Sequence, residues 1–312
     1  MLTVASKSAL VASDAHVGGQ LHQSLAQRGI KLELAKASRD LGLDCTAGAA
    51  RSTVSHKARA RKALRKVIKV KCIKRQAIAT GKFLKAAVVS QATWGHQGYG
   101  FSPSKLQKLR GALATSFAHW KTGCCTTTLL ALEMGMDDPI IKLRMELFAT
   151  WIDMWRRYPS RRPAWKSAWG LIHKRLSECK DNTRWYNVYG GISVLLSTLM
   201  DIGWYPQAPD YWLNDMGGSY FFTDDPVDEV ALYQRMKQDL ARIGWKNAAK
   251  HHGGRGMENG IYLGQLSSKL HNLDKRGKAM QAGALRTDAI AGLWPPARCS
   301  QEGMQQYDIC EL

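Results

Sequence analysis

The feature that most constrains this chain is a stretch of 88 residues without a single acidic side chain. No Asp or Glu occurs between Asp44 and Glu133, whereas residues 45–132 contain 17 Lys and Arg. The flanking segments are nearly balanced, with 5 basic against 4 acidic residues in 1–44 and 23 against 21 in 133–312. The stretch cannot neutralise its own charge, so we expect it to meet a polyanion.

The composition indicates a globular protein. The chain has 312 residues, of which 45% are hydrophobic and 11 are Trp, which is enough to fill a core and excludes a disordered tail or a fibre. The net charge of +20 indicates which kinds of partner the chain can bind, but it does not indicate how the chain folds.

Seven unevenly spaced cysteines do not resemble a secreted disulfide framework. Residues 1–10 contain Lys7 and two serines in place of a signal-peptide core, and the longest apolar run, Val194–Met200, is too short to span a membrane. We therefore expect no membrane partner and an intracellular location, cytoplasmic or nuclear.

The hydrophobic period changes after Asp44. Residues 2–11, 17–25 and 32–43 predict strand, helix and strand, and from Ser52 to about Leu293 helical spacing dominates. The expected helices cover residues 57–85 with an interruption at Gly81, 104–118, 139–158, 165–176, 186–200, 226–243, 263–270 and 273–293. The predicted fold class is mainly α, with the only appreciable β structure in a small α/β segment at 1–45.

The helix at 57–85 is the strongest candidate for a binding surface. An apolar stripe of Leu64, Val67, Ile68, Cys72 and Ile73 is surrounded by basic side chains. Such side chains neutralise phosphates and release counterions. The candidate phosphate-binding residues are Lys57, Arg59, Arg61, Lys62, Arg65, Lys66, Lys69, Lys74, Arg75 and Lys82. The alternative is a solvated charged face, but such faces normally mix both signs.

Aromatic residues supply a second group of candidates. The Gly-rich loop 94–101 carries Trp94, His96 and Tyr99, which either stack on bases or pack the loop against its own domain. Trp151, Trp155, Tyr158, Trp165 and Trp169 recur at helical spacing and are expected in the core. The neighbouring residues Arg156, Arg157, Arg161 and Arg162 leave a second contact patch open.

Several apparent catalytic motifs fail on their context. Phe222-Thr223-Asp224-Asp225 resembles a polymerase metal turn, but Pro226 and helical spacing follow, so Asp225 is predicted to cap a helix. His251-His252 has no ligand at metal spacing, Cys124-Cys125 lacks the spacer of a zinc pair, and Gly81-Lys82 is not a phosphate loop. No catalytic residue and no metal ligand is predicted.

The order of the motifs resembles the C-terminal part of a non-LTR (LINE-like, jockey-type) retrotransposon reverse transcriptase, truncated at both ends. Ser6-Lys7-Ser8 is similar to the late palm strand, and Arg39 to Asp44, with Leu41-Gly42, to the primer-grip turn. The basic helices resemble the thumb, Trp94-Gly95-His96-Gln97 an aromatic-Gly loop, and Gly123–Thr128, Trp204–Trp212 and Leu293–Arg298 the helical region that follows.

The resemblance implies four segments: a palm remnant at 1–48, a thumb-like region at 49–122, a helical region at 123–300, and the start of a zinc-knuckle-like segment at 301–312. Cys310 would be the first zinc ligand, and Zn would bind only if the chain continued past it. The palm aspartates that hold Mg are absent, so no cofactor is expected and the chain is predicted to be inactive as a polymerase.

Two functions follow as hypotheses. The leading one is a nucleic-acid-binding fragment of a retrotransposon RNA-directed DNA polymerase, with a template–primer backbone of RNA or DNA as partner and no small-molecule substrate. The alternative is a free-standing basic helical DNA- or RNA-binding protein of architectural type. A metal nuclease would require clustered acids, which the sequence lacks.

Overall fold

The computed structural model describes residues 8–40, 43–46, 51–73, 80–117, 124–222, 229–251 and 254–290. These residues are mainly helical, as the sequence predicts. They form two compact units: unit 1 comprises residues up to Lys66 together with 86–103 and 146–227, and unit 2 comprises 67–85, 104–145 and 228 onward. Helices α2 (Val54–Ile73) and α8 (Pro139–Arg157) contribute residues to both units.

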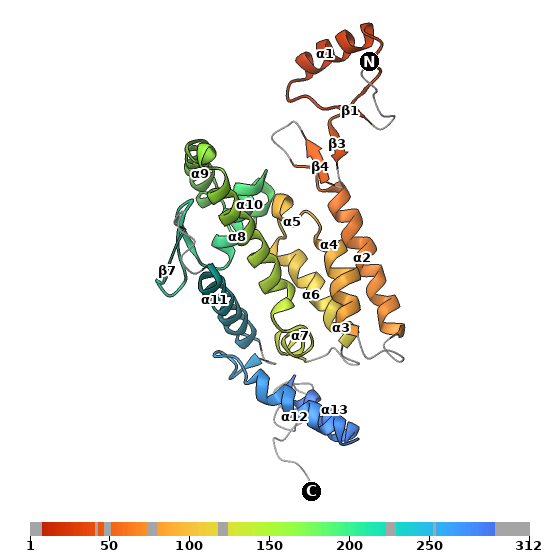
Figure 1. Ribbon diagram of the computed structural model, residues 1–312, viewed down its shortest axis with the longest axis vertical. Coiled ribbons are helices and arrows are strands. Elements are labelled where there is room, and N and C mark those ends of the chain that lie inside the picture. The colour runs from red at the N-terminus through yellow and green to blue at the C-terminus, as the bar shows by residue number, and fades with distance from the viewer. Residues whose placement is uncertain are drawn as a thin grey trace. The chain divides into compact units, whose positions relative to one another are not determined.

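Unit 1 begins with the expected strand–helix–strand arrangement (Figure 1). Strands β1 (Ala9–Leu10) and β2 (Glu33–Leu34) pair in parallel, and α1 (Ala15–Gln27) connects them. Asp14 starts α1 by accepting hydrogen bonds from the backbone of the first helical turn. A separate antiparallel hairpin, β3 (Ala37–Asp40) with β4 (Leu43–Thr46), follows. The single strand expected at 32–43 is therefore divided between two small sheets.

Aromatic rings fill the rest of unit 1. Trp151 and Trp155 of α8 and Trp169 of α9 (Arg162–Ser177) are buried, which confirms that these tryptophans are core residues, whereas Tyr158 is exposed. Phe148 lies 5.5 Å from Trp204 and 5.2 Å from Trp212, between ring centroids. Helix α10 (Gly191–Asp201) adds a buried aliphatic face, and the short helices α4 (Ser90–Thr93) and α5 (His96–Tyr99) complete the unit.

The expectation that residues 1–45 hold the only appreciable β structure is wrong. Strands β5 (Tyr205–Ala208), β6 (Tyr211–Leu213) and β7 (Ser219–Phe221) form a three-stranded antiparallel sheet. Its inward side chains, among them Trp212 and Tyr220, are fully buried. The Asn214 side chain closes the β6–β7 turn by accepting from the Met216 and Gly218 backbone N–H groups. Each strand is too short to show a two-residue period in the sequence.

All regular elements among the described residues of unit 2 are helices. It contains α3 (Thr80–Phe83) followed by a π-helical turn (Leu84–Val89) that begins in this unit, α6 (Pro103–Phe117), α7 (Thr126–Met134), α11 (Glu229–Ala249), α12 (Leu263–Lys275) and α13 (Ala279–Ala289). The single helix expected at 273–293 is wrong, because Gly277 adopts a positive φ of 69° between α12 and α13. Cys125 is buried and precedes α7, so the expected helix-entry segment is confirmed.

Candidate nucleic-acid interface

Helix α2 has one buried side and one basic side. His56, Ala63 and Val67 are buried. The expected apolar stripe is wrong at Ile68, which is 67% exposed, because the packed side follows the smaller residues instead. Five basic side chains are exposed on the outer side: Lys57, Arg61, Lys62, Arg65 and Lys69. At 100° per residue these five fall within an arc of about 140°, opposite the buried side.

The five exposed side chains make an extended basic face, which we call the α2 face. From Lys57 to Lys69 the helix rises by about 18 Å. Within the described parts of the chain, none of the five forms a hydrogen bond or an ion pair. Several of them stand three or four residues apart, where like charges repel by roughly 0.2–0.5 kcal/mol per pair. The α2 face is therefore a set of uncompensated cations held on a rigid element.

The start of α2 is fixed by Asp44, the last acid before the basic stretch. Its carboxylate accepts hydrogen bonds from the Ser55 backbone N–H at 2.9 Å and from the Ser52 hydroxyl at 3.1 Å. Partial burial raises the pKa of Asp44, but hydrogen bonds from Ser55 and Ser52 and the charge of Arg59 outweigh it, and the pKa is lowered. The hairpin thus adds an acceptor for the first turn of α2, next to the Ser52 hydroxyl, which accepts from the Val54 N–H at 3.5 Å.

Arg59, Lys62 and Lys66 follow one another along one edge of the α2 face. Arg59 donates to the Trp94 backbone carbonyl at 3.2 Å, which brings the loop after α4 next to this edge. The Trp94 side chain is 58% exposed. Trp94 therefore lies beside the cations with part of its ring accessible, and its stacking on a base stays a prediction.

His96 and Tyr99 are placed in the interior. His96 donates from Nδ1 to the Thr93 carbonyl at 3.0 Å, and its Nε2 lies 3.5 Å from a Glu146 carboxylate oxygen. The Tyr99 hydroxyl donates to the Asp44 carbonyl at 2.8 Å, and His56 stacks on the Tyr99 ring at 6.1 Å. Both side chains are buried, so neither offers a face to a base, and packing is their role in this structure.

Two residues that hold the loop 94–101 in place, Arg51 and Trp185, were not predicted from the sequence. Arg51 donates to the Tyr99 carbonyl and, at 3.0 Å, to the Trp185 carbonyl. The Trp185 ring leaves no room beside Gly100, where an added Cβ would lie 2.4 Å from a ring carbon. Gly100 has a φ of 72°, which favours glycine. A single arginine before a helix belongs to no recognisable sequence pattern, so the role of Arg51 could not be predicted.

The remaining predicted residues are distributed as follows. Lys82 is exposed on α3 in unit 2, and His251 is exposed after α11. Several predicted positions lie outside the described residues: Lys7, Leu41, Gly42, Lys74, Arg75, Asp224, Asp225, His252, Cys310 and the segment 293–298. Across the described ranges, no group of three or more His, Cys, Asp or Glu side chains could hold a metal ion. No described helix is both long and apolar enough to cross a membrane.

Comparisons with known proteins provide no relative for this arrangement. No protein-family model, no curated protein and no solved structure matches the chain.

Proposed function

We propose that the chain binds the sugar-phosphate backbone of nucleic acid through the α2 face. The observation that carries the proposal is the set of five exposed cations without an acidic partner among the described residues. Phosphates at regular intervals along a strand are the partner that matches such a row, and their neutralisation releases counterions. Backbone contacts carry no sequence information, so binding is expected to be largely independent of sequence.

A membrane surface fits the α2 face less well. A helix that lies on a membrane needs an apolar side free to insert among the lipids. The packed side of α2 is already covered, since His56, Ala63 and Val67 are buried. Among the α2 side chains that the structure describes, 54–70, the only large apolar ones that are exposed are Val54 and Ile68. Nucleic acid is therefore the proposed polyanion.

The test compares two variants of equal charge. In the first, Lys57, Arg61, Lys62 and Arg65 are replaced by Gln, and in the control the exposed Lys269, Lys275, Arg276 and Lys278 of unit 2 are replaced by Gln. The wild-type affinity should fall with salt with a log–log slope of roughly −4 to −6, from about 0.9 per phosphate. The α2 variant should lose about one unit of slope per contact removed, and the control should not.

Circular dichroism establishes that both variants are folded. All four α2 substitutions lie on the exposed side of the helix, so the fold should survive. A folded α2 variant with the wild-type affinity and slope, or a control that weakens binding equally, would reject the α2 face as the binding surface.

We also propose, from the resemblance of the sequence, that the chain derives from the part of a non-LTR reverse transcriptase that follows the catalytic aspartates. The order of a βαβ unit, a β-hairpin and a basic helix supports this origin. The sheet at 205–221 is not part of that expectation. Genomic sequence decides between the origins: a strand with an aromatic-x-Asp-Asp turn upstream, and Cys and His codons downstream, would identify a piece of a polymerase.

Without those flanking elements, the architectural DNA- or RNA-binding protein becomes the better proposal. Under either origin the isolated chain should incorporate no nucleotide on a primed template with magnesium or manganese. Incorporation that disappears in Asp224→Ala would show that the aspartate pair is catalytic.

A further inference from the structure

Unit 1 contains a second segment without acids. Residues 154–177 contain seven Lys and Arg and no Asp or Glu, which is a higher density of basic residues than in the 88-residue stretch. The segment covers the end of α8, a 3₁₀ turn (Pro159–Arg161) and the whole of α9. Four of its cations are exposed and have no acidic partner among the described residues: Arg161, Lys166, Lys174 and Arg175. We call these four side chains the α9 face.

One end of the α9 face lies beside the Trp155 ring, which Arg162, a neighbour of the face, also contacts. The Arg162 guanidinium carbon lies 5.2 Å from the Trp155 ring centroid, and its Nε donates to the Trp155 carbonyl at 2.9 Å. The Lys166 ammonium lies 6.0 Å from the same centroid. Two cations four residues apart therefore share one buried indole, which attracts both while they repel each other.

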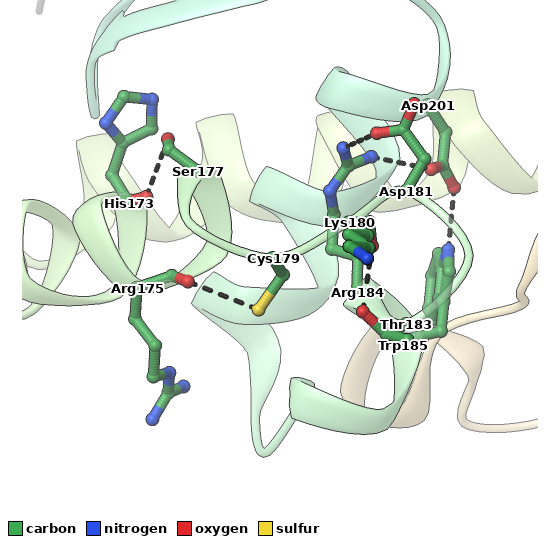
Figure 2. Close-up of polar contacts among 10 residues, drawn as sticks. All are labelled: His173, Arg175, Ser177, Cys179, Lys180, Asp181, Thr183, Arg184, Trp185 and Asp201. Carbon is green, nitrogen blue, oxygen red and sulfur yellow. Dashed lines mark hydrogen bonds and ion pairs between the residues drawn. The ribbon is translucent and has the colours of Figure 1, made fainter.

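The second half also places a cation on an aromatic ring. The Arg175 guanidinium carbon lies 4.5 Å from the Tyr189 centroid, and Nη2 donates to the Asn187 carbonyl at 3.4 Å. Figure 2 shows the Arg175 side chain turned away from the polar cluster around Arg184. The Tyr189 side chain is itself 39% exposed. Cations beside exposed aromatic rings are typical of surfaces that bind nucleic-acid strands.

Arg184, in the same unit, differs from the cations of the α9 face because it is buried and paired with acids. It is buried and pairs with Asp201, with Nη1 3.1 Å from Oδ1, and also with Asp181 (Figure 2). Trp185 Nε1 donates to the other Asp201 oxygen at 2.7 Å. Among the described residues the cations of the α9 face have no such acids, so they are available to an external anion.

The α9 face and the first part of the α2 face lie at different borders of unit 1. Helix α10 packs against α9 and against α5, while His56 at the start of α2 stacks on Tyr99 of α5. In Figure 1, α5 and α10 stand between α2 and α9. One strand that follows the α2 face therefore leaves the α9 face open.

We propose that the α9 face is a second site for a nucleic-acid backbone, so that a single chain bridges two nucleic-acid segments. The ligand class is the same phosphate backbone as at the α2 face, and in this respect the inference rests on the proposed function. The new element is bivalency: two separate basic faces allow simultaneous engagement that neither face gives alone.

The test is a bridging experiment with the full chain. A biotin-labelled duplex on beads captures a fluorescent duplex of different sequence only if the protein holds both. Three variants are compared with wild type: the α9 variant, with Arg161, Lys166, Lys174 and Arg175 replaced by Gln; the α2 variant; and the unit 2 control described above. Sedimentation is run on each protein to confirm that it is monomeric at the concentration used.

Wild type and control should bridge, and each of the other two variants should capture at least about tenfold less fluorescent duplex while still binding one duplex. Duplexes of about six base pairs, which match the length of one face, should bind to wild type twice and to each variant once. An α9 variant that bridges and binds twice like wild type overturns the inference and leaves the α2 proposal intact. An α2 variant that keeps both properties overturns the α2 proposal instead.

Arg175 and Lys166 contact aromatic rings, so a milder variant guards against misfolding. The side chains of Arg161 and Lys174 make no ring contact or hydrogen bond among the described residues. Replacing only these two by Gln should lower the captured fluorescence and flatten the salt dependence of the second binding step by about two units. Unchanged capture in this folded double variant also counts against the second site.

Discussion

Helices α2 and α6 both belong to the acid-free stretch, yet they use their cations in opposite ways. Arg110 of α6 is buried and forms a two-pronged ion pair with Asp138, which lies outside the stretch, at 2.8 and 2.9 Å. Lys85 is likewise paired with Asp137 at 2.7 Å. The α2 face has no such partner among the described residues. A basic residue in the acid-free stretch can therefore still be paired with an acid from another part of the chain. The fold determines which cations are paired in this way and which remain free to bind an external anion.

The largest expected effect is the loss of stability when the ion pair between Arg110 and Asp138 is broken. Arg110→Met leaves the Asp138 carboxylate charged and buried, which should lower the free energy of unfolding by about 3–5 kcal/mol. Urea denaturation measures this loss. The salt dependence of nucleic-acid binding should not change at a temperature where the variant is folded, because Arg110 is 4% exposed.

The double variant Arg110→Met, Asp138→Asn is the control for that loss. It removes the unpaired charge while Asn can still accept the hydrogen bond that the Ile140 N–H gives to Asp138 at 3.0 Å. Stability should recover in part. A single variant as stable as wild type would mean that Arg110 is no more structural than the cations of the α2 face.

A smaller effect should come from the acid that starts α2. Asp44→Ala removes the acceptor of the Ser55 N–H and should lower the free energy of unfolding by about 1 kcal/mol. In wild type the folded-state pKa of Asp44 lies below its ordinary value of 3.8, so its contribution is complete above that value. The contribution is lost as the pH falls through the folded-state pKa.

The pH dependence is measured against Asp44→Asn, which keeps an acceptor without the charge. The stability difference between wild type and this variant should be constant from pH 7 to about pH 5 and should shrink as the solution becomes more acidic. A difference that does not change with pH would show that the hydrogen bonds alone fix the helix start.

The smallest expected effect is an increase in stability rather than a loss. Arg61→Glu replaces two like-charge contacts, with Lys57 and Arg65, by two opposite-charge contacts on the exposed side of α2. Its free energy of unfolding should rise by about 0.5–1 kcal/mol at low salt while nucleic-acid affinity falls. Urea denaturation and binding titrations on the same preparation give both numbers. Stability and affinity that fall together would mean that Arg61 has a structural role.

Long, strongly periodic segments could be predicted from the sequence. Pro139 and the four-residue recurrence of Leu143, Leu147, Trp151 and Trp155 locate α8 within one residue at each end. The side of a helix that packs was harder to predict. Ile68 belongs to the apolar stripe by residue type, but α2 packs through His56 and Ala63, because their neighbours in space decide which side is covered.

The sheet and the loop contacts could not be predicted for different reasons. Strands of three or four residues, such as Tyr211–Leu213, are stabilised by rings that the sequence places more than fifty residues away, including Phe148. In the loop 94–101, the glycines and aromatic residues predicted a structured loop, but they did not predict which side chains face the interior. Trp94 is exposed and Tyr99 is buried: Arg59 donates to the Trp94 carbonyl, and the Tyr99 hydroxyl donates to the Asp44 carbonyl.

Arg51 connects the start of α2, which carries one basic face, with the residues that precede α10. It lies just before α2 and donates to the Trp185 carbonyl, while the Trp185 indole donates to Asp201 at the end of α10. In mechanical terms, tension that a bound strand exerts on α2 passes through this chain of contacts into α10, against which α9 packs. A protein held between two nucleic-acid segments would therefore transmit the force through these side-chain contacts.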